Sequence, residues 1–140
     1  MEVFEETKRL AAEAVQLASA LGKKLDFSEA SVEVVEQLLA QIAPEFPHLS
    51  EAAQDLTVER FGCYLLEVGR KAFKGQIQFE PERQVPVLVV GEPDCRIAVI
   101  TWEKVRARLL GDEHDNIVFF WAGFSTRAKK RVAGSDVLVM

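Results

Sequence analysis

Few side chains in this sequence have the types and spacing that catalysis requires. A hydrolytic nucleophile needs a serine or cysteine with a histidine base in reach, and the only histidines are His48 and His114. His48 lies in a proline-flanked connection between two predicted helices, and His114 lies in the acidic segment 112–115. We interpret both as exposed loop residues. The sequence therefore indicates no catalytic residue, and we expect a protein that is not an enzyme.

Metal and cofactor signatures are also missing. Segment 112–115 carries three acids and one histidine, but it lacks the alternating acids and central glycine of a calcium loop. We expect it to begin the following helix, where acids offset the positive end of the helix dipole. The two cysteines form no Cys-x-x-Cys pair, and segment 91–94 is typical of a hairpin turn rather than a phosphate loop. We predict no metal and no cofactor.

Three polar residues border the apolar segment 61–70 and are the candidate site. Glu67 and Arg70 are three residues apart, so they can pair across one helical turn, and Tyr64 adds a hydroxyl nearby. If this face is buried against the sheet, the three groups lie in a low-dielectric site that can bind a ligand or partner. The alternative is a partly exposed ion pair at the edge of the core.

The elements that position these residues follow from hydrophobic periodicity. Steps of three and four residues predict helices over 2–22, from about 28 to 43, and from 51 to Gly75. The third helix is apolar over more than one face, and we expect Gly62 and Gly69 to allow close packing there. Asp26 or Ser28 can cap the second helix, and Ser50 can cap the third.

The period changes after Gly75. Alternating and β-branched residues predict strands near 77–79, 85–90 and 96–101, joined as an antiparallel meander. Helical spacing returns over 102–110 and from 115 onward, and residues 137–139 are a predicted final strand. We therefore expect one α+β domain over residues 1–140, with helices packed on one face of a small antiparallel sheet in the order ααα-βββ-αα-β.

Charge and composition exclude several classes of function. The net charge is −5, and the densest basic cluster, residues 127–131, is short and complements a helix C-terminus. We therefore expect no nucleic-acid partner. The acidic N-terminus does not resemble a secretory signal, and no apolar run approaches the length that spans a bilayer. We expect a cytoplasmic protein with no membrane partner, in which Cys63 and Cys95 are reduced and buried.

Two segments resemble a family of small uncharacterised bacterial domains. A Leu-Asp-aromatic-Ser start precedes a helix at residues 25–28, and a Gly-x-Tyr-x-x-Glu pattern lies on the next helix at residues 62–67. The resemblance covers residues 25–110. It implies a bacterial cytosolic protein and carries over no catalytic residue.

Three hypotheses of function follow. The first is a non-enzymatic interaction or regulatory module, of an immunity or accessory type, which binds a protein through an acidic surface and an apolar patch. The second is a small-ligand-binding protein or enzyme with a pocket between the third helix and the sheet, using Tyr64, Glu67 and Arg70. The third is a homodimer formed by pairing of the terminal strand or another free sheet edge.

Overall fold

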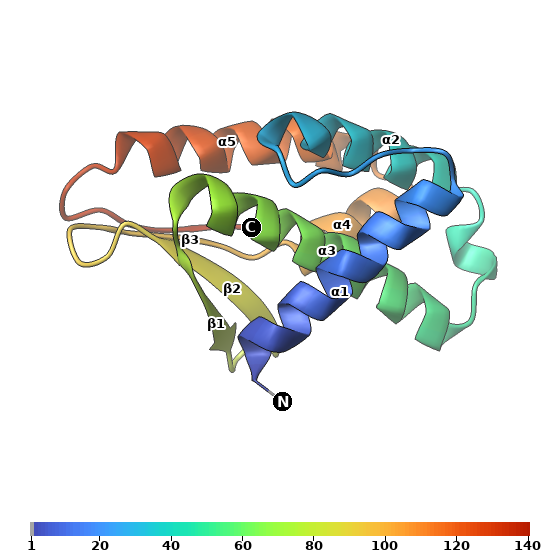
Figure 1. Cartoon of the computed structure of the whole chain (residues 1–140), viewed down its shortest axis with the longest axis horizontal. Helices are drawn as coiled ribbons and strands as arrows, with labels where there is room; N and C mark the ends of the chain where they lie inside the picture. Colours follow the sequence, from blue (N-terminus) through green and yellow to red (C-terminus); the bar gives the residue numbers. More distant parts are fainter. Residues whose placement is uncertain (1) are drawn as a thin grey trace.

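Helices cover one face of a four-stranded sheet in the computed structural model, which describes residues 2–140 (Figure 1). The helices are α1 (Val3–Ala20), α2 (Val32–Ile42), α3 (Glu51–Phe73), α4 (Trp102–Leu109) and α5 (Ile117–Lys130). The strands are β1 (Gln76–Glu80), β2 (Val85–Val90), β3 (Arg96–Val99) and β4 (Asp136–Val139). The predicted α+β class and element order are confirmed. Short 3₁₀ turns, absent from the prediction, precede α2, α3 and α5.

Side-chain caps fix where three of these elements begin. Ser50 caps α3 as predicted, and Ser28, rather than Asp26, caps the turn that leads into α2. Asp26 instead accepts from the amide and hydroxyl of Ser28. The expectation that segment 112–115 begins α5 is wrong, because Asn116 caps that helix and the acidic segment forms a turn of its own.

The sheet has the order β1-β2-β3-β4 and is mixed rather than wholly antiparallel. The meander of β1, β2 and β3 is antiparallel as predicted, but β4 pairs with β3 in parallel. The reason is the path between them. The short helix α4 sits at the end of the sheet and α5 runs back along it, so the chain enters β4 at the end where β3 began (Figure 1).

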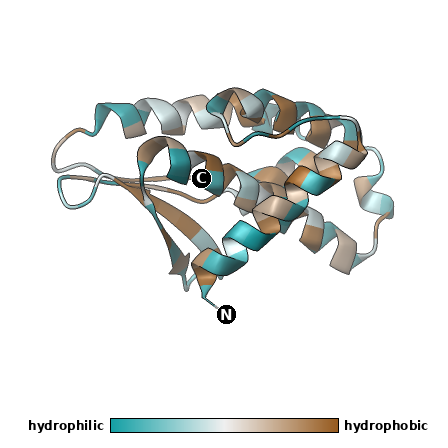
Figure 2. Ribbon diagram, in the orientation of Figure 1, coloured by the Kyte–Doolittle hydropathy of each residue, from teal (hydrophilic) through white to brown (hydrophobic). Residues whose placement is uncertain are grey.

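The two faces of the sheet have different surroundings. Alternate residues such as Leu88, Val90 and Val99 pack into the main core beneath the helices. The opposite face carries a smaller apolar cluster of β2 and β3 residues, and Figure 2 shows how strongly hydrophobic β2 is along its length. Within residues 2–140, no helix combines the length and apolar content that crossing a bilayer requires.

Helix α3 lies at the centre of the core, where two glycines allow the closest approaches. A Cβ at Gly62 would lie 2.3 Å from Cδ1 of Trp102, and one at Gly69 would lie 2.5 Å from Cδ2 of Leu88. Both distances are far below van der Waals contact, so the predicted packing role of these glycines is confirmed. The indole of Trp102 and the side chain of Leu88 occupy space that any larger residue would take.

We expect Gly62→Ala to destabilise the protein by about 1–3 kcal/mol, because the added methyl overlaps the Trp102 ring. The matched control is Gly123→Ala in α5, where a Cβ meets no atom within 4 Å and alanine is the better helix former, by about 1 kcal/mol. Urea unfolding of both variants measures the difference. A Gly62→Ala protein as stable as the wild type would contradict the close packing of α3 on α4.

Candidate functional site

Tyr64, the first of the three candidate residues, is completely buried on α3. Its hydroxyl oxygen accepts a hydrogen bond from the Phe27 amide at 2.8 Å and lies 2.6 Å from Oγ of Ser31. Its ring lies 4.9 Å from that of Phe27. Burial raises the pKa of Tyr64 above its usual value, so the phenol stays protonated at neutral pH. The contacts join α3 to the segment before α2.

Glu67 and Arg70 form the ion pair that their spacing predicts. Nε of Arg70 lies 2.6 Å from Oε2 of Glu67, and a terminal guanidinium nitrogen lies 2.9 Å from Oε1. The Glu67 carboxylate is buried, whereas the Arg70 side chain is 27% exposed and its guanidinium lies 5.0 Å from the centre of the Phe4 ring on α1. The pair therefore connects α3 to α1. A ligand or partner role for these residues stays a prediction, and none of the three lines the groove described below.

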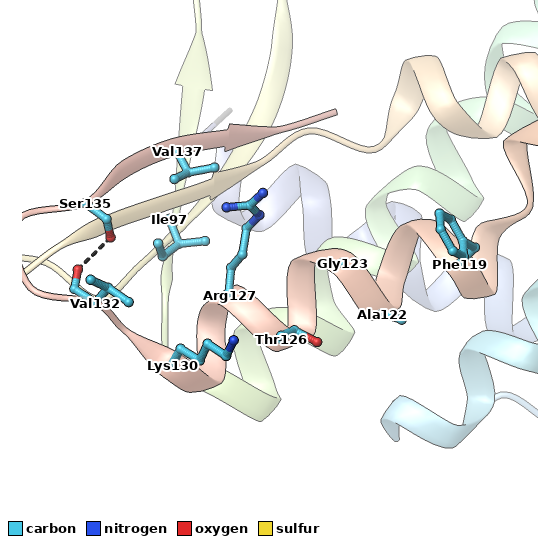
Figure 3. A pocket seen from close by; sticks show the side chains of 10 residues that line it. All are labelled: Ile97, Phe119, Ala122, Gly123, Thr126, Arg127, Lys130, Val132, Ser135 and Val137. Carbon is cyan, nitrogen blue, oxygen red and sulfur yellow. Dashed lines mark hydrogen bonds between the residues drawn. The ribbon is translucent and has the colours of Figure 1, made fainter.

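A groove of about 640 Å³ lies between α5 and the strands β3 and β4 (Figure 3). Its apolar walls are made by Ile97, Val137, Val132 and Phe119. The small residues at positions 122–123 of α5 leave room on the helix side of the groove. We call this feature the α5–β4 groove.

Two cations line the α5–β4 groove without an ionic partner among residues 2–140. Arg127 extends from α5 toward β4 in Figure 3, and Lys130 lies one turn further along the helix. Their neighbours in the basic cluster are engaged, since Nζ of Lys129 lies 3.7 Å from Glu29 and Arg131 donates to the Phe73 carbonyl at 2.7 Å. Arg131 also donates to the Ala128 carbonyl, so it complements the C-terminal ends of α3 and α5, as predicted for the cluster.

Strand β4 borders the groove and is an unpaired edge of the sheet. The Ser135 carbonyl accepts from the β3 amide of Arg96 at 2.8 Å, and the Val139 carbonyl accepts from Ile100 at 3.0 Å. Because alternate residues of a strand face the same neighbour, the N–H and C=O groups of residues 136 and 138 point to the free side. This edge offers hydrogen bonds to a further strand.

Exposed apolar side chains surround this edge. Phe119 is 82% exposed and Val132 is 61% exposed, and Leu138 of β4 is exposed on the face opposite Val137. Phe119 and Val132 line the same groove, and large exposed apolar groups along a groove are typical of contact sites rather than of solvent-facing helices. The helical period from Ile117 places Phe120 inside and Phe119 outside, and both positions are confirmed. The period does not show that Phe119 lies beside a sheet edge.

In the described part of the chain, no three His, Cys, Asp or Glu side chains are grouped to hold a metal ion. His48 and His114 are both exposed, as expected. Comparisons of the chain with protein-family models, curated proteins and solved structures found no match. The function must therefore be argued from the geometry.

We expect Tyr64→Phe to lower the free energy of unfolding by about 1–3 kcal/mol, since the Phe27 amide loses its acceptor in a buried site. Adding Ser31→Ala completes a double-mutant cycle, and the two changes should be non-additive by at least about 0.5 kcal/mol because the hydroxyls are in contact. Chemical denaturation of the four proteins measures the coupling. Simple additivity would show that the two hydroxyls do not interact.

Proposed function

We propose that this protein is a protein-interaction module, and that its partner supplies an extended, acidic segment that adds to β4 as a fifth strand. The observation that carries the proposal is the combination of an unpaired, apolar edge strand with two unpaired cations in the adjoining groove. Strand addition beside a helix is a recurrent way to recognise peptides. Main-chain hydrogen bonds supply affinity and the groove supplies specificity.

The geometry supports an extended occupant rather than a helical one. The free N–H and C=O groups of Asp136 and Leu138 are spaced as a strand requires, whereas a helix has no main-chain groups left to pair with them. Val137 points into the α5–β4 groove. Alternate side chains of an added strand would lie on the same face of the sheet as Val137, against Phe119 and the small residues of α5.

The charges support an acidic occupant. Arg127 and Lys130 are both exposed and line the groove, in a protein whose net charge is −5. Two local cations on an otherwise acidic surface select a partner that carries carboxylates where it crosses α5.

The other edge of the sheet is protected against the same use. Strand β1 carries Gln76, Gln78 and Glu80, and the N-terminal part of α1 contacts it. Polar side chains and a covering helix are the usual ways to prevent an edge from pairing. β4 carries one exposed acid, Asp136, but its other exposed residue, Leu138, is large and apolar.

We expect a short fluorescent peptide that alternates valine with glutamate to bind the wild-type protein, with an affinity that falls as salt is added. A peptide that alternates valine with lysine should bind at least about tenfold more weakly, a difference of about 1.4 kcal/mol. N-methylation of one alternate set of peptide amides should abolish binding, while methylation of the other set is tolerated. Fluorescence anisotropy measures the binding of all four peptides. Equal binding of the acidic and basic peptides would overturn the proposal.

We expect the double variant Arg127→Glu and Lys130→Glu to lose about tenfold or more in affinity for the acidic peptide, because both charges facing it are reversed. Lys129→Glu is the matched control, since Lys129 faces Glu29 instead of the groove. Leu138→Pro removes an outward N–H and leaves the pairing with β3 intact, so it should also weaken binding. Leu138→Ala keeps that N–H and should retain most of the affinity.

Sedimentation of the wild-type protein separates partner binding from self-association. A monomer at all concentrations supports the proposal. A concentration-dependent dimer that Leu138→Pro disrupts and the acidic peptide does not would overturn it in favour of the homodimer predicted from the sequence.

A further inference from the structure

The α5–β4 groove has two unlike ends. α5 and β4 run in opposite directions, so the last turn of α5 lies near the start of β4 (Figure 3). Lys130, Val132 and Ser135 line this end of the groove, and Phe119 lines the other. Phe119 and Lys130 are about 16 Å apart along the axis of α5, a length that about five residues of extended chain span. The groove therefore takes a short segment.

The chain itself closes the first of these ends. Residues 131–135 cross from α5 to β4, so a segment that lies between these elements must stop at this connection or leave the surface. Hydrogen bonds hold the connection in place. The Gly134 amide donates to the Asp94 carbonyl at 2.8 Å. The amide and the hydroxyl of Ser135 both donate to the Val132 carbonyl, at 3.1 and 2.6 Å.

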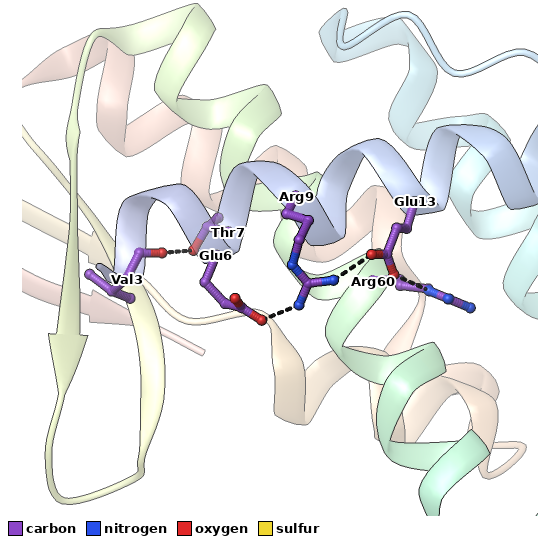
Figure 4. Close-up of polar contacts among 6 residues, drawn as sticks. All are labelled: Val3, Glu6, Thr7, Arg9, Glu13 and Arg60. Carbon is purple, nitrogen blue, oxygen red and sulfur yellow. Dashed lines mark hydrogen bonds and ion pairs between the residues drawn. The ribbon is translucent and has the colours of Figure 1, made fainter. Parts of the chain in front are cut away.

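Two unpaired cations lie at this closed end. Arg127 and Lys130 are exposed on the last turn of α5, and neither forms an ion pair within the described part of the chain. Arg9 on α1, by contrast, is already shared by Glu6 and Glu13 (Figure 4). The C-terminus of α5 contributes a partial negative charge of about half a unit, which two full positive charges outweigh. The closed end is therefore suited to an anion.

The acid at the start of β4 does not occupy this position. Asp136 is exposed and Val137 is half-buried, and Asp136 is not among the residues that line the groove. Because side chains alternate along a strand, the Asp136 carboxylate lies on the face opposite Val137. The outward main-chain groups of Asp136 stay available to an added strand.

We propose that the segment added to β4 is the C-terminal end of its partner chain, which runs antiparallel to β4 and places its terminal carboxylate against Arg127 and Lys130. This inference rests on the proposed strand-binding function. A guanidinium can bind both oxygens of a carboxylate, and the ammonium adds a second charge. The cations also exclude the opposite direction, because an N-terminal ammonium at the closed end would meet two like charges.

The open end determines the side chains of the partner. Phe119 is largely exposed there, and Ala122 and Gly123 leave room beside it. Side chains of the added strand alternate between its two faces, so every second residue counted back from the terminus faces this surface. The partner is therefore a chain end whose last residues, about five in number, are extended, apolar at alternate positions and ended by a free carboxylate.

The test compares three forms of one peptide that alternates valine with glutamate, ends in valine and carries its fluorophore at the N-terminus. The forms are the free acid, the C-terminal amide and an extension by two glycines, which keeps the carboxylate but moves it past the closed end. Fluorescence anisotropy measures their affinities, and we expect the free acid to bind at least about tenfold more tightly than either other form.

The outcomes separate this inference from the proposed function. Equal affinity of the acid and the amide would overturn the role of the terminal carboxylate and leave strand addition intact. If none of the three forms binds, strand addition itself is wrong, and this inference fails with it.

Variants assign the carboxylate to the two cations. In the double variant Arg127→Gln and Lys130→Gln, the free acid should lose about tenfold in affinity and the amide much less, so that the two bind alike. Lys129→Gln is the matched control, because Lys129 faces Glu29, and it should keep the wild-type difference. Phe119→Ala should weaken acid and amide by the same factor. An unchanged difference between acid and amide in the double variant would overturn the assignment.

A nitroxide at the peptide N-terminus tests the direction of the strand. In nitrogen-15 NMR spectra we expect it to broaden the amide signals near Phe119 more strongly than those of residues 132–135, which border the closed end. Stronger broadening of residues 132–135 would show a parallel strand and overturn the proposal.

Discussion

The whole fold depends on the burial of α3, in which every residue from Phe61 to Gly69 is removed from solvent. A helix that is apolar on all sides is unstable alone and must be covered on all sides. α1 covers one side, α4 and α5 others, and the sheet the remainder. Gly62 and Gly69 set how near these layers come, and the one charged residue in the run, Glu67, is accepted because Arg70 pairs with it.

Local features of this arrangement were predictable because they depend on neighbours in sequence. Periodicity located the helices and the meander, and the close approaches at Gly62 and Gly69 followed from placing glycine in a buried helix. The direction of β4 was not predictable, since it depends on how α4 and α5 return the chain along the sheet. The role of segment 112–115 was also predicted wrongly, because the side chain of Asn116, rather than one of these acids, caps α5.

The candidate site shows what could not be predicted from the sequence, namely whether a polar residue in an apolar helix has a partner. Tyr64, Glu67 and Arg70 were chosen because polar groups in an apolar helix need an explanation, and the structure supplies partners for each: Ser31 and Phe27 for the tyrosine, and the ion pair for the other two. A binding site and a satisfied core network both give polar residues within an apolar helix, so the sequence pattern is the same for the two. They differ in whether a hydrogen-bonding group is left without a partner, and the sequence does not show which groups lack partners.

An unmet requirement marks the proposed strand-binding site. In the core, by contrast, the buried polar groups of Tyr64 and Glu67 have partners. At the surface, one sheet edge is protected by Gln, Glu and α1, while β4 is left open beside Arg127 and Lys130. An unprotected edge risks aggregation. Such an edge is tolerated in a stable protein most readily when a further strand is there to complete it.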